Sequence, residues 1–136
     1  MAELARAVAS LRITGDDLVP AEVTALLGAE PSKSFTRGEP QPLSQRPRQF
    51  GMWSLQSAST EPADVDAQID EILTQLTTDV TVWTELAQRF NVDLFCGWFM
   101  KRGNEGVSLE PASLTALGNR HILLDLDLYA GDPEDR

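Results

Sequence analysis

Residues 18–28, LVPAEVTALLG, and residues 109–118, LEPASLTALG, repeat one short sequence at the two ends of the chain. In each copy a proline stands where a first helical residue needs no amide donor, and a glycine follows the last apolar residue, so each copy predicts a short helix. Duplication and independent use of the same helix signals would both produce this repeat. The identities are Leu18 with Leu109, Pro20 with Pro111, Ala21 with Ala112, Thr24 with Thr115, Ala25 with Ala116 and Leu26 with Leu117.

Strands are expected on both sides of each predicted helix. Residues 5–14, ARAVASLRIT, alternate in the manner of a strand with one buried face, and a short polar strand at 32–37 follows the first helix. Residues 91–101, NVDLFCGWFMK, lack clean alternation, which suggests a central strand covered on both faces. The last strand, 121–129, is expected to point its even-numbered residues toward the core: Ile122, Leu124, Leu126 and Leu128.

The middle of the chain predicts a further strand at 50–57, FGMWSLQS, and a pair of helices. Apolar residues recur at spacings of three and four from Val65 to Phe90, which is typical of a helix with one buried face. Thr77, Thr78 and Asp79 interrupt this pattern, and such residues favour helix caps over helix interiors. We therefore expect two helices, at about 63–76 and 79–90.

Together these elements predict an α+β fold in a single domain, residues 1–136. We expect one mostly antiparallel sheet of about five strands with helices packed on one face. The order of elements is similar to a ferredoxin-like, split βαβ arrangement with an extra helix–strand unit. Three prolines in residues 38–49, GEPQPLSQRPRQ, predict a mobile loop, and residues 131–136 are expected to be a frayed tail.

The composition restricts the functional classes. The chain has 136 residues and a net charge of -10, which opposes binding to nucleic acid or to an anionic membrane. No apolar run is long enough for a membrane span, and the N-terminus lacks the pattern of a signal peptide. A single cysteine excludes an internal disulfide and a cysteine-based zinc site, so we expect a cytoplasmic protein.

Basic residues are concentrated in residues 33–48, where Glu39 is the one acidic residue. The basic residues of this stretch are Lys33, Arg37, Arg46 and Arg48. This stretch has a charge of +3, which leaves -13 for the remainder of the chain. Arg37, Arg46 and Arg48 are candidate contacts for a phosphate or an acidic partner, because the guanidinium group suits such ligands. The stretch lacks the glycine spacing of a phosphate loop, and a solvated hairpin connection is the favoured interpretation.

Cys96 and the last strand carry the candidate chemistry. Cys96 has apolar neighbours, so a buried structural role is favoured over that of a nucleophile. Asp125 and Asp127 lie on one face of the strand, roughly 7 Å apart, and would suit an acid–base pair or a shared cation. Solvated charges that protect a sheet edge are the commoner arrangement, and His121 lies too far along the strand to join them.

The sheet face opposite the predicted helices is the candidate binding surface, because it combines aromatic and charged residues that are typical of interfaces. Two interpretations stay open: this face is exposed, or the mobile loop or the helical pair folds over it. A ligand, a protein partner or a second copy of the chain would suit an uncovered face, and of these we expect a homodimer. The candidate residues are Arg12, Phe95, Phe99, Lys101, Asp125, Asp127 and Tyr129.

Several short segments, in a compatible order over nearly the whole chain, resemble a bacterial family known as domain of unknown function 4279. The resemblance implies an α+β domain from a bacterium and brings no established activity, catalytic residue or cofactor. The segments are Thr14–Asp17, the Leu27-Gly28 helix end with Pro31 beyond it, Gly38-Glu39, Trp53–Ser57, the helix of residues 109–117 and the strand that finishes at Tyr129.

The sequence favours a non-enzymatic binding or protein-interaction module of the bacterial cytosol. An acidic module of this kind would suit a basic protein partner, as in an immunity-like role, or a homodimeric scaffold. The alternative is a small hydrolase or metal-dependent enzyme that uses Asp125 and Asp127. We assign no catalytic residue, metal ligand or cofactor, and we expect no nucleic acid or membrane partner.

Overall fold

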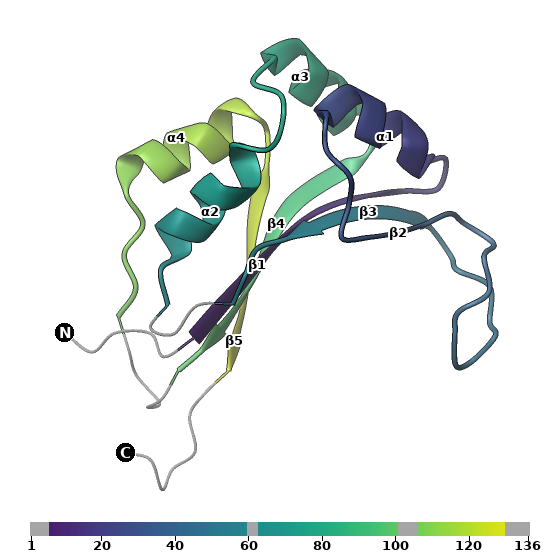
Figure 1. Ribbon diagram of the computed structural model, residues 1–136, viewed down its shortest axis with the longest axis horizontal. Helices are drawn as coiled ribbons and strands as arrows, with labels where there is room; N and C mark the ends of the chain where they lie inside the picture. The colour runs from purple at the N-terminus through teal and green to yellow at the C-terminus, as the bar shows by residue number, and fades with distance from the viewer. Residues whose placement is uncertain (1–5, 60–62, 101–105, 130–136) are drawn as a thin grey trace, which may run out of the picture.

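The computed structural model describes residues 6–59, 63–100 and 106–129. Figure 1 shows the helices of these described residues on one side of a single twisted sheet and none of them on the other side. None of the helices in this described part of the chain has the length and apolar character needed to span a bilayer. The elements are β1 (Arg6–Gly15), α1 (Pro20–Leu27), β2 (Lys33–Phe35), β3 (Gly51–Gln56), α2 (Val65–Leu73), α3 (Val80–Arg89), β4 (Asn91–Phe99), α4 (Pro111–Asn119) and β5 (Leu123–Tyr129).

The sheet has the strand order β2-β3-β1-β4-β5. Strand β1 runs antiparallel to both of its neighbours, β3 and β4, and β2 runs antiparallel to β3. Among the strands of the described residues only the β4–β5 pair is parallel, and α4 lies in the connection between these two strands. The predicted α+β class, with one mostly antiparallel sheet of five strands and helices on one face, is confirmed. The ferredoxin-like detail stays a prediction.

Strand β1 lies at the centre of the sheet, and its residues alternate between a buried side and a more accessible side. Ala7, Ala9, Leu11 and Ile13 are fully buried under the helices, while the residues between them face the other side. Full burial of a large aliphatic side chain stabilises the fold by about 1.5–3 kcal/mol, so this strand anchors the core. The predicted buried face of residues 5–14 is therefore confirmed.

Helix α1 begins and ends at the predicted signals. Pro20 occupies the first turn, and Gly28 adopts the left-handed conformation, with φ 85°, at the C-terminal cap. Val23 and Leu27 are buried against the core. A hydrogen bond of 3.0 Å from Trp53 Nε1 to Thr24 Oγ1 fixes the helix to β3.

The helical pair breaks where the capping residues predicted it. Asp79 caps α3 by accepting a hydrogen bond of 2.9 Å from the Thr81 amide, and Asp64 caps α2 by accepting one from the Ala67 amide. Trp83, the largest side chain of α3, is fully buried, and its indole nitrogen donates to the Thr77 carbonyl at 2.9 Å. Two helices joined by a short connection are therefore confirmed.

Helix α4 repeats the sequence of α1 but is less buried. Leu117 is its one buried residue, and Leu114 is 50% exposed. Asp66 of α2 holds the start of α4, because its carboxylate accepts hydrogen bonds from the Glu110 amide at 3.0 Å and from Ser113 Oγ at 2.6 Å.

The prediction that four residues of the last strand face the core is wrong for two of them. Ile122 is buried and Leu124 is partly buried, whereas Leu126 is 41% and Leu128 is 55% exposed. Alternation determines to which side of the sheet a side chain points, but burial also requires a helix above it. Strand β5 lies at the end of the sheet, where the helix layer leaves these two leucines uncovered.

Residues 36–50 connect β2 to β3 as a long hairpin that extends beyond the sheet (Figure 1). Hydrogen bonds cross between its arms, from the Gly38 amide to the Arg48 carbonyl at 2.8 Å and from the Arg48 amide to the Glu39 carbonyl at 2.7 Å. The mobility predicted for residues 38–49 stays a prediction. The frayed tail predicted at 131–136 lies outside the described residues.

Candidate functional site

The sheet face opposite the helices carries the predicted candidate residues. In the antiparallel register of β1 and β4, Arg12 lies opposite Asp93, Ser10 opposite Phe95, and Arg6 opposite Phe99. In the parallel register of β4 and β5, Phe95, Gly97 and Phe99 lie beside Asp125, Asp127 and Tyr129. The helical pair packs on the other side, so it does not cover this face. We call these residues of β1, β4 and β5 the open face.

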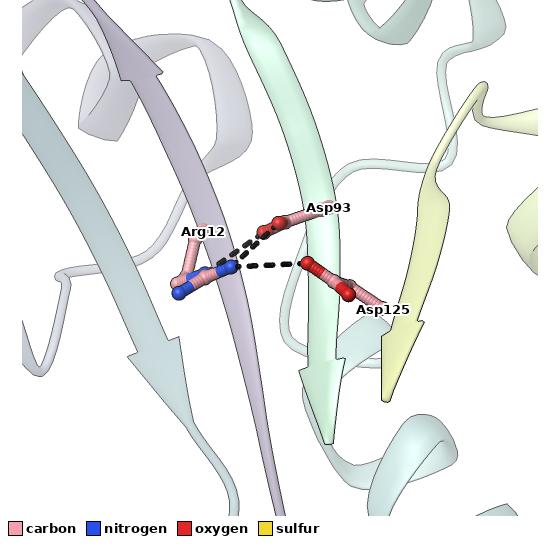
Figure 2. Close-up of polar contacts among 3 residues, drawn as sticks. All are labelled: Arg12, Asp93 and Asp125. Carbon is pink, nitrogen blue, oxygen red and sulfur yellow. Dashed lines mark hydrogen bonds and ion pairs between the residues drawn. The ribbon is translucent and has the colours of Figure 1, made fainter. Parts of the chain in front are cut away.

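Arg12 is at the centre of one cluster on the open face (Figure 2). Its guanidinium donates to both oxygens of Asp93, from Nε at 2.9 Å and from Nη2 at 2.7 Å, and Nη2 lies 3.7 Å from Asp125 Oδ2. Its planar group also lies over the Phe95 ring, 4.5 Å from the centroid. The hydrogen bond to Asp93 is the main cause that raises the pKa of Arg12. This cation is therefore fixed by three strands at once.

A second cluster surrounds Phe99 on the same face. The Arg6 guanidinium lies 3.9 Å from the centroid of the Phe99 ring, and the Tyr129 ring stacks against Phe99 at 4.7 Å with an interplanar angle of 6°. The Tyr129 hydroxyl donates to Asp127 Oδ2 at 2.6 Å, and this bond raises the pKa of Tyr129. The two clusters repeat one arrangement, in which an arginine stacks on a phenylalanine beside a carboxylate of β5.

Asp125 and Asp127 share the open face but have separate partners. Asp125 contacts Arg12, and Asp127 accepts from Tyr129. In the described ranges, no three acid, histidine or cysteine side chains are grouped closely enough to hold a metal ion. His121 precedes β5, with φ 56°, and so is not part of the strand. The geometry thus gives the two acids the role of fixing neighbouring side chains.

Cys96 lies on the face of β4 that the helices cover. Its side chain is fully buried, between Ala9 of β1 and Leu126 of β5 in the strand register. Burial raises the pKa of the thiol from its ordinary 9.0 to about 11. Because the thiolate is the nucleophilic form, this environment agrees with the structural role favoured by the sequence.

The three loop arginines line one open hollow of about 500 Å³ on the hairpin. Arg48 is the best fixed of them, since its guanidinium lies over the Phe35 ring, 3.9 Å from the centroid. Arg37 has a long ion pair of 3.7 Å with Asp16, and both side chains are exposed. The remaining member, Arg46, completes a positively charged rim. The hairpin thus brings together the predicted loop contacts, at some distance from the open face (Figure 1).

One residue that the sequence argument missed is central to the open face. Asp93 binds Arg12 more closely than Asp125 does, although only Asp125 was a candidate. The period-two pattern that places Phe95 and Phe99 on this face also places Asp93 there, so the signal was present. Lys101, the other candidate on this strand, lies outside the described residues.

The family described as domain of unknown function (DUF4279) matches residues 4–131, which is nearly the whole chain. No curated protein and no solved structure matches the chain.

Proposed function

The chain belongs to the DUF4279 family, and we propose that it is a non-enzymatic protein-interaction module that binds its partner through the open face. The observation that carries this proposal is the arrangement of the layers. Four helices cover one face of the sheet, and the other face keeps arginine, phenylalanine and tyrosine side chains partly accessible. Aromatic residues and arginine are enriched in protein interfaces relative to other surfaces.

The side chains of the open face are preorganised for binding. Arg6 and Arg12 are each stacked on a ring, and the Phe99 ring is in turn stacked on Tyr129. A side chain that is already fixed loses less conformational entropy when a partner covers it. The stacked pairs therefore supply a rigid, amphipathic surface without the cost of ordering it.

The charge of the chain supports a basic protein as the partner. Apart from the stretch that contains the hairpin, the chain has a charge of -13, and two acids of β5 lie on the open face. The negative electrostatic potential of these charges accelerates the encounter with a positively charged protein and repels nucleic acid. An immunity-like role in the bacterial cytosol, in which the module neutralises a basic toxin, is the specific form of this proposal.

Affinity capture with matched variants tests the proposal. The double variant Phe99→Ala, Tyr129→Ala removes the aromatic stack from the open face, and Val80→Ala changes an exposed apolar residue at the start of α3 as a control. We expect the parent and the control to retain a basic protein that the double variant loses, and the captured amount to fall as salt is raised. A partner that all three proteins retain equally, independent of salt, would contradict the proposal.

A second copy of the chain is the other occupant that this surface would suit, as in the homodimeric scaffold expected from the sequence. Sedimentation velocity over a wide range of concentrations distinguishes the two occupants. A dimer that dissociates in the Phe99→Ala, Tyr129→Ala variant supports a homodimer through the open face. A parent protein that stays monomeric throughout removes it.

The alternative function, a small hydrolase or metal-dependent enzyme at Asp125 and Asp127, has weaker support. Each carboxylate has its own partner, so neither is positioned with the other around a common ligand. The Asp127→Asn variant decides the matter. If it keeps every metal-dependent and ligand-dependent stabilisation of the parent, the enzymatic alternative should be dropped.

A further inference from the structure

Strand β5 forms one end of the sheet, and within the described residues it pairs only with the β4 side. The Tyr129 carbonyl accepts a hydrogen bond of 2.9 Å from the Met100 amide, so the peptide groups of Tyr129 point toward β4. In an extended strand these groups alternate in direction from one residue to the next. The amides and carbonyls of Leu124, Leu126 and Leu128 therefore point away from the sheet.

Asp125 and Asp127 are the protection that this edge carries against pairing. Natural edge strands are commonly blunted by charged side chains, proline or a bulge. Strand β5, LLDLDLY, is a continuous strand of seven residues whose charges are all negative, so they oppose pairing with an acidic or identical strand and do not oppose a basic one. Leu126 and Leu128 are exposed on its helix side, and Asp125 and Asp127 lie on the open face. The edge therefore offers backbone hydrogen bonds, an apolar row and an acidic row.

The acidic row disfavours a second copy of the chain on this edge. If two β5 strands paired antiparallel about their centres, each Asp125 would lie opposite an Asp127. Like charges directly opposite each other destabilise a strand pair. An added strand with basic residues on one face and aliphatic residues on the other meets no such repulsion.

We propose that the β5 edge binds an extended segment of another protein in which lysine or arginine alternates with aliphatic residues. The segment extends the sheet by one strand, as in other cases of strand addition. Its basic side chains face Asp125 and Asp127, and its aliphatic side chains cover Leu126 and Leu128. This inference rests on the proposed function, since it specifies the chemistry of the partner and the part of the surface that it contacts first.

The probe is an eight-residue peptide of alternating lysine and valine. Two peptides serve as controls: alternating aspartate and valine, and a block peptide with the same four lysines followed by four valines. Binding is measured by amide chemical shifts of the isotope-labelled protein. We expect shifts centred on β5 with the alternating basic peptide, about tenfold weaker binding of the block peptide, and no binding of the acidic peptide.

Variants of β5 test the edge itself. Leu126→Pro removes an amide that points outward and leaves the hydrogen bonds to β4 in place, and Leu126→Val is its matched control. Asp127→Lys keeps the backbone and inverts the charge. We expect Leu126→Pro and Asp127→Lys each to weaken binding of the basic peptide at least about tenfold, and Leu126→Val, which keeps both the amide and an aliphatic side chain, to weaken it far less. Circular dichroism checks that each variant is folded.

Three results would overturn the inference. They are the absence of β5 shifts with the alternating basic peptide at millimolar concentration, equal binding of the block peptide, and a dimer of the parent that Leu126→Pro disrupts. Failure here is separable from failure of the proposed function. If the Phe99→Ala, Tyr129→Ala variant loses a captured partner that Leu126→Pro retains, the interaction through the open face stands and strand addition at β5 does not.

Discussion

Helices α1 and α4 begin with the same residues and reach different degrees of burial. Val23 of α1 is fully buried, whereas Leu114, at the same place in α4, is half exposed. Thr24 accepts a hydrogen bond from Trp53, whereas Thr115 is exposed. A proline start therefore specifies where a helix begins, while the strand beneath the helix and the neighbouring helix determine how much of it is buried.

The surroundings of the two helices explain the difference. Helix α1 packs on β3, in the sheet interior, and its last carbonyl, that of Leu27, accepts a hydrogen bond of 2.9 Å from the Thr77 amide. Helix α4 packs on the edge strand β5, and a hollow of about 220 Å³ separates parts of it from α2. Trp98 of β4, beside Leu128 in register, has a buried indole nitrogen that no described residue accepts. The α4 side is therefore the looser part of the core.

The largest expected effect comes from the same substitution made on each helix. Leu27→Ala removes a buried side chain and should lower the free energy of unfolding by about 3 kcal/mol, because the transfer energy is lost and a cavity remains. Leu114→Ala removes a half-exposed side chain and should change it by less than about 0.5 kcal/mol. Urea denaturation of both variants measures the difference. Equal losses would show that α4 is packed as tightly as α1.

The reactivity of Cys96 measures how firmly β4 and β5 are packed in the folded protein. Burial raises its pKa by about two units, to about 11, so at pH 8 the folded protein should hold about one hundredfold less thiolate than the unfolded chain. Alkylation by iodoacetamide should be slower by at least about that factor in the folded protein. A folded rate close to that of the urea-unfolded chain would mean that β4 and β5 separate readily.

The same shift gives a pH dependence of stability. The folded thiol keeps its proton to a higher pH than the unfolded thiol, so unfolding releases protons between these two pKa values. The Cys96 contribution to stability is therefore complete below about pH 9 and falls as pH rises toward about 11. A Cys96→Ser protein should lack this part of the alkaline loss, and urea denaturation at pH 8 and pH 10 would show it.

A smaller effect on stability should come from the threonine that stands at the same place in both helices, Thr24 in α1 and Thr115 in α4. Thr24→Val keeps the shape of the side chain but leaves Trp53 Nε1 without its acceptor, which should cost about 1–2 kcal/mol. Thr115→Val alters an exposed residue and should stay within about 0.5 kcal/mol. Thermal unfolding of the pair measures both. A cost at Thr115 that matched the cost at Thr24 would contradict the packing difference.

The elements that were predictable from the sequence are those with local causes. The alternation of residues 5–14 gave the buried face of β1, and Asp79 marked the break between α2 and α3 because its side chain caps a helix. The bond from Arg12 to Asp93 depends on the register of β1 against β4, which brings together residues that are distant in the sequence. Local patterns do not specify such a register.

The burial of the last strand was mispredicted for a related reason. Its period-two pattern assigned Leu126 and Leu128 correctly to the helix side, yet whether a helix reaches them depends on the length and position of α4. By contrast, the placement of Asp125, Asp127 and Tyr129 on the opposite face required only the alternation. The side of the sheet to which each residue points was therefore predictable from the sequence, whereas its burial under a helix was not.

The smallest expected effect concerns those uncovered leucines. Leu128→Thr replaces an apolar side chain that is 55% exposed with a residue of high strand propensity, so the free energy of unfolding should change by less than about 0.5 kcal/mol. Ala9→Thr, on the buried face of β1, is the contrasting variant, because it forces extra atoms and a hydroxyl into a filled core and should cost at least about 2 kcal/mol. Urea denaturation of the two proteins compares the centre and the edge of one sheet. If Leu128→Thr cost as much as Ala9→Thr, Leu128 would be buried in solution, and another surface would have to cover the β5 edge.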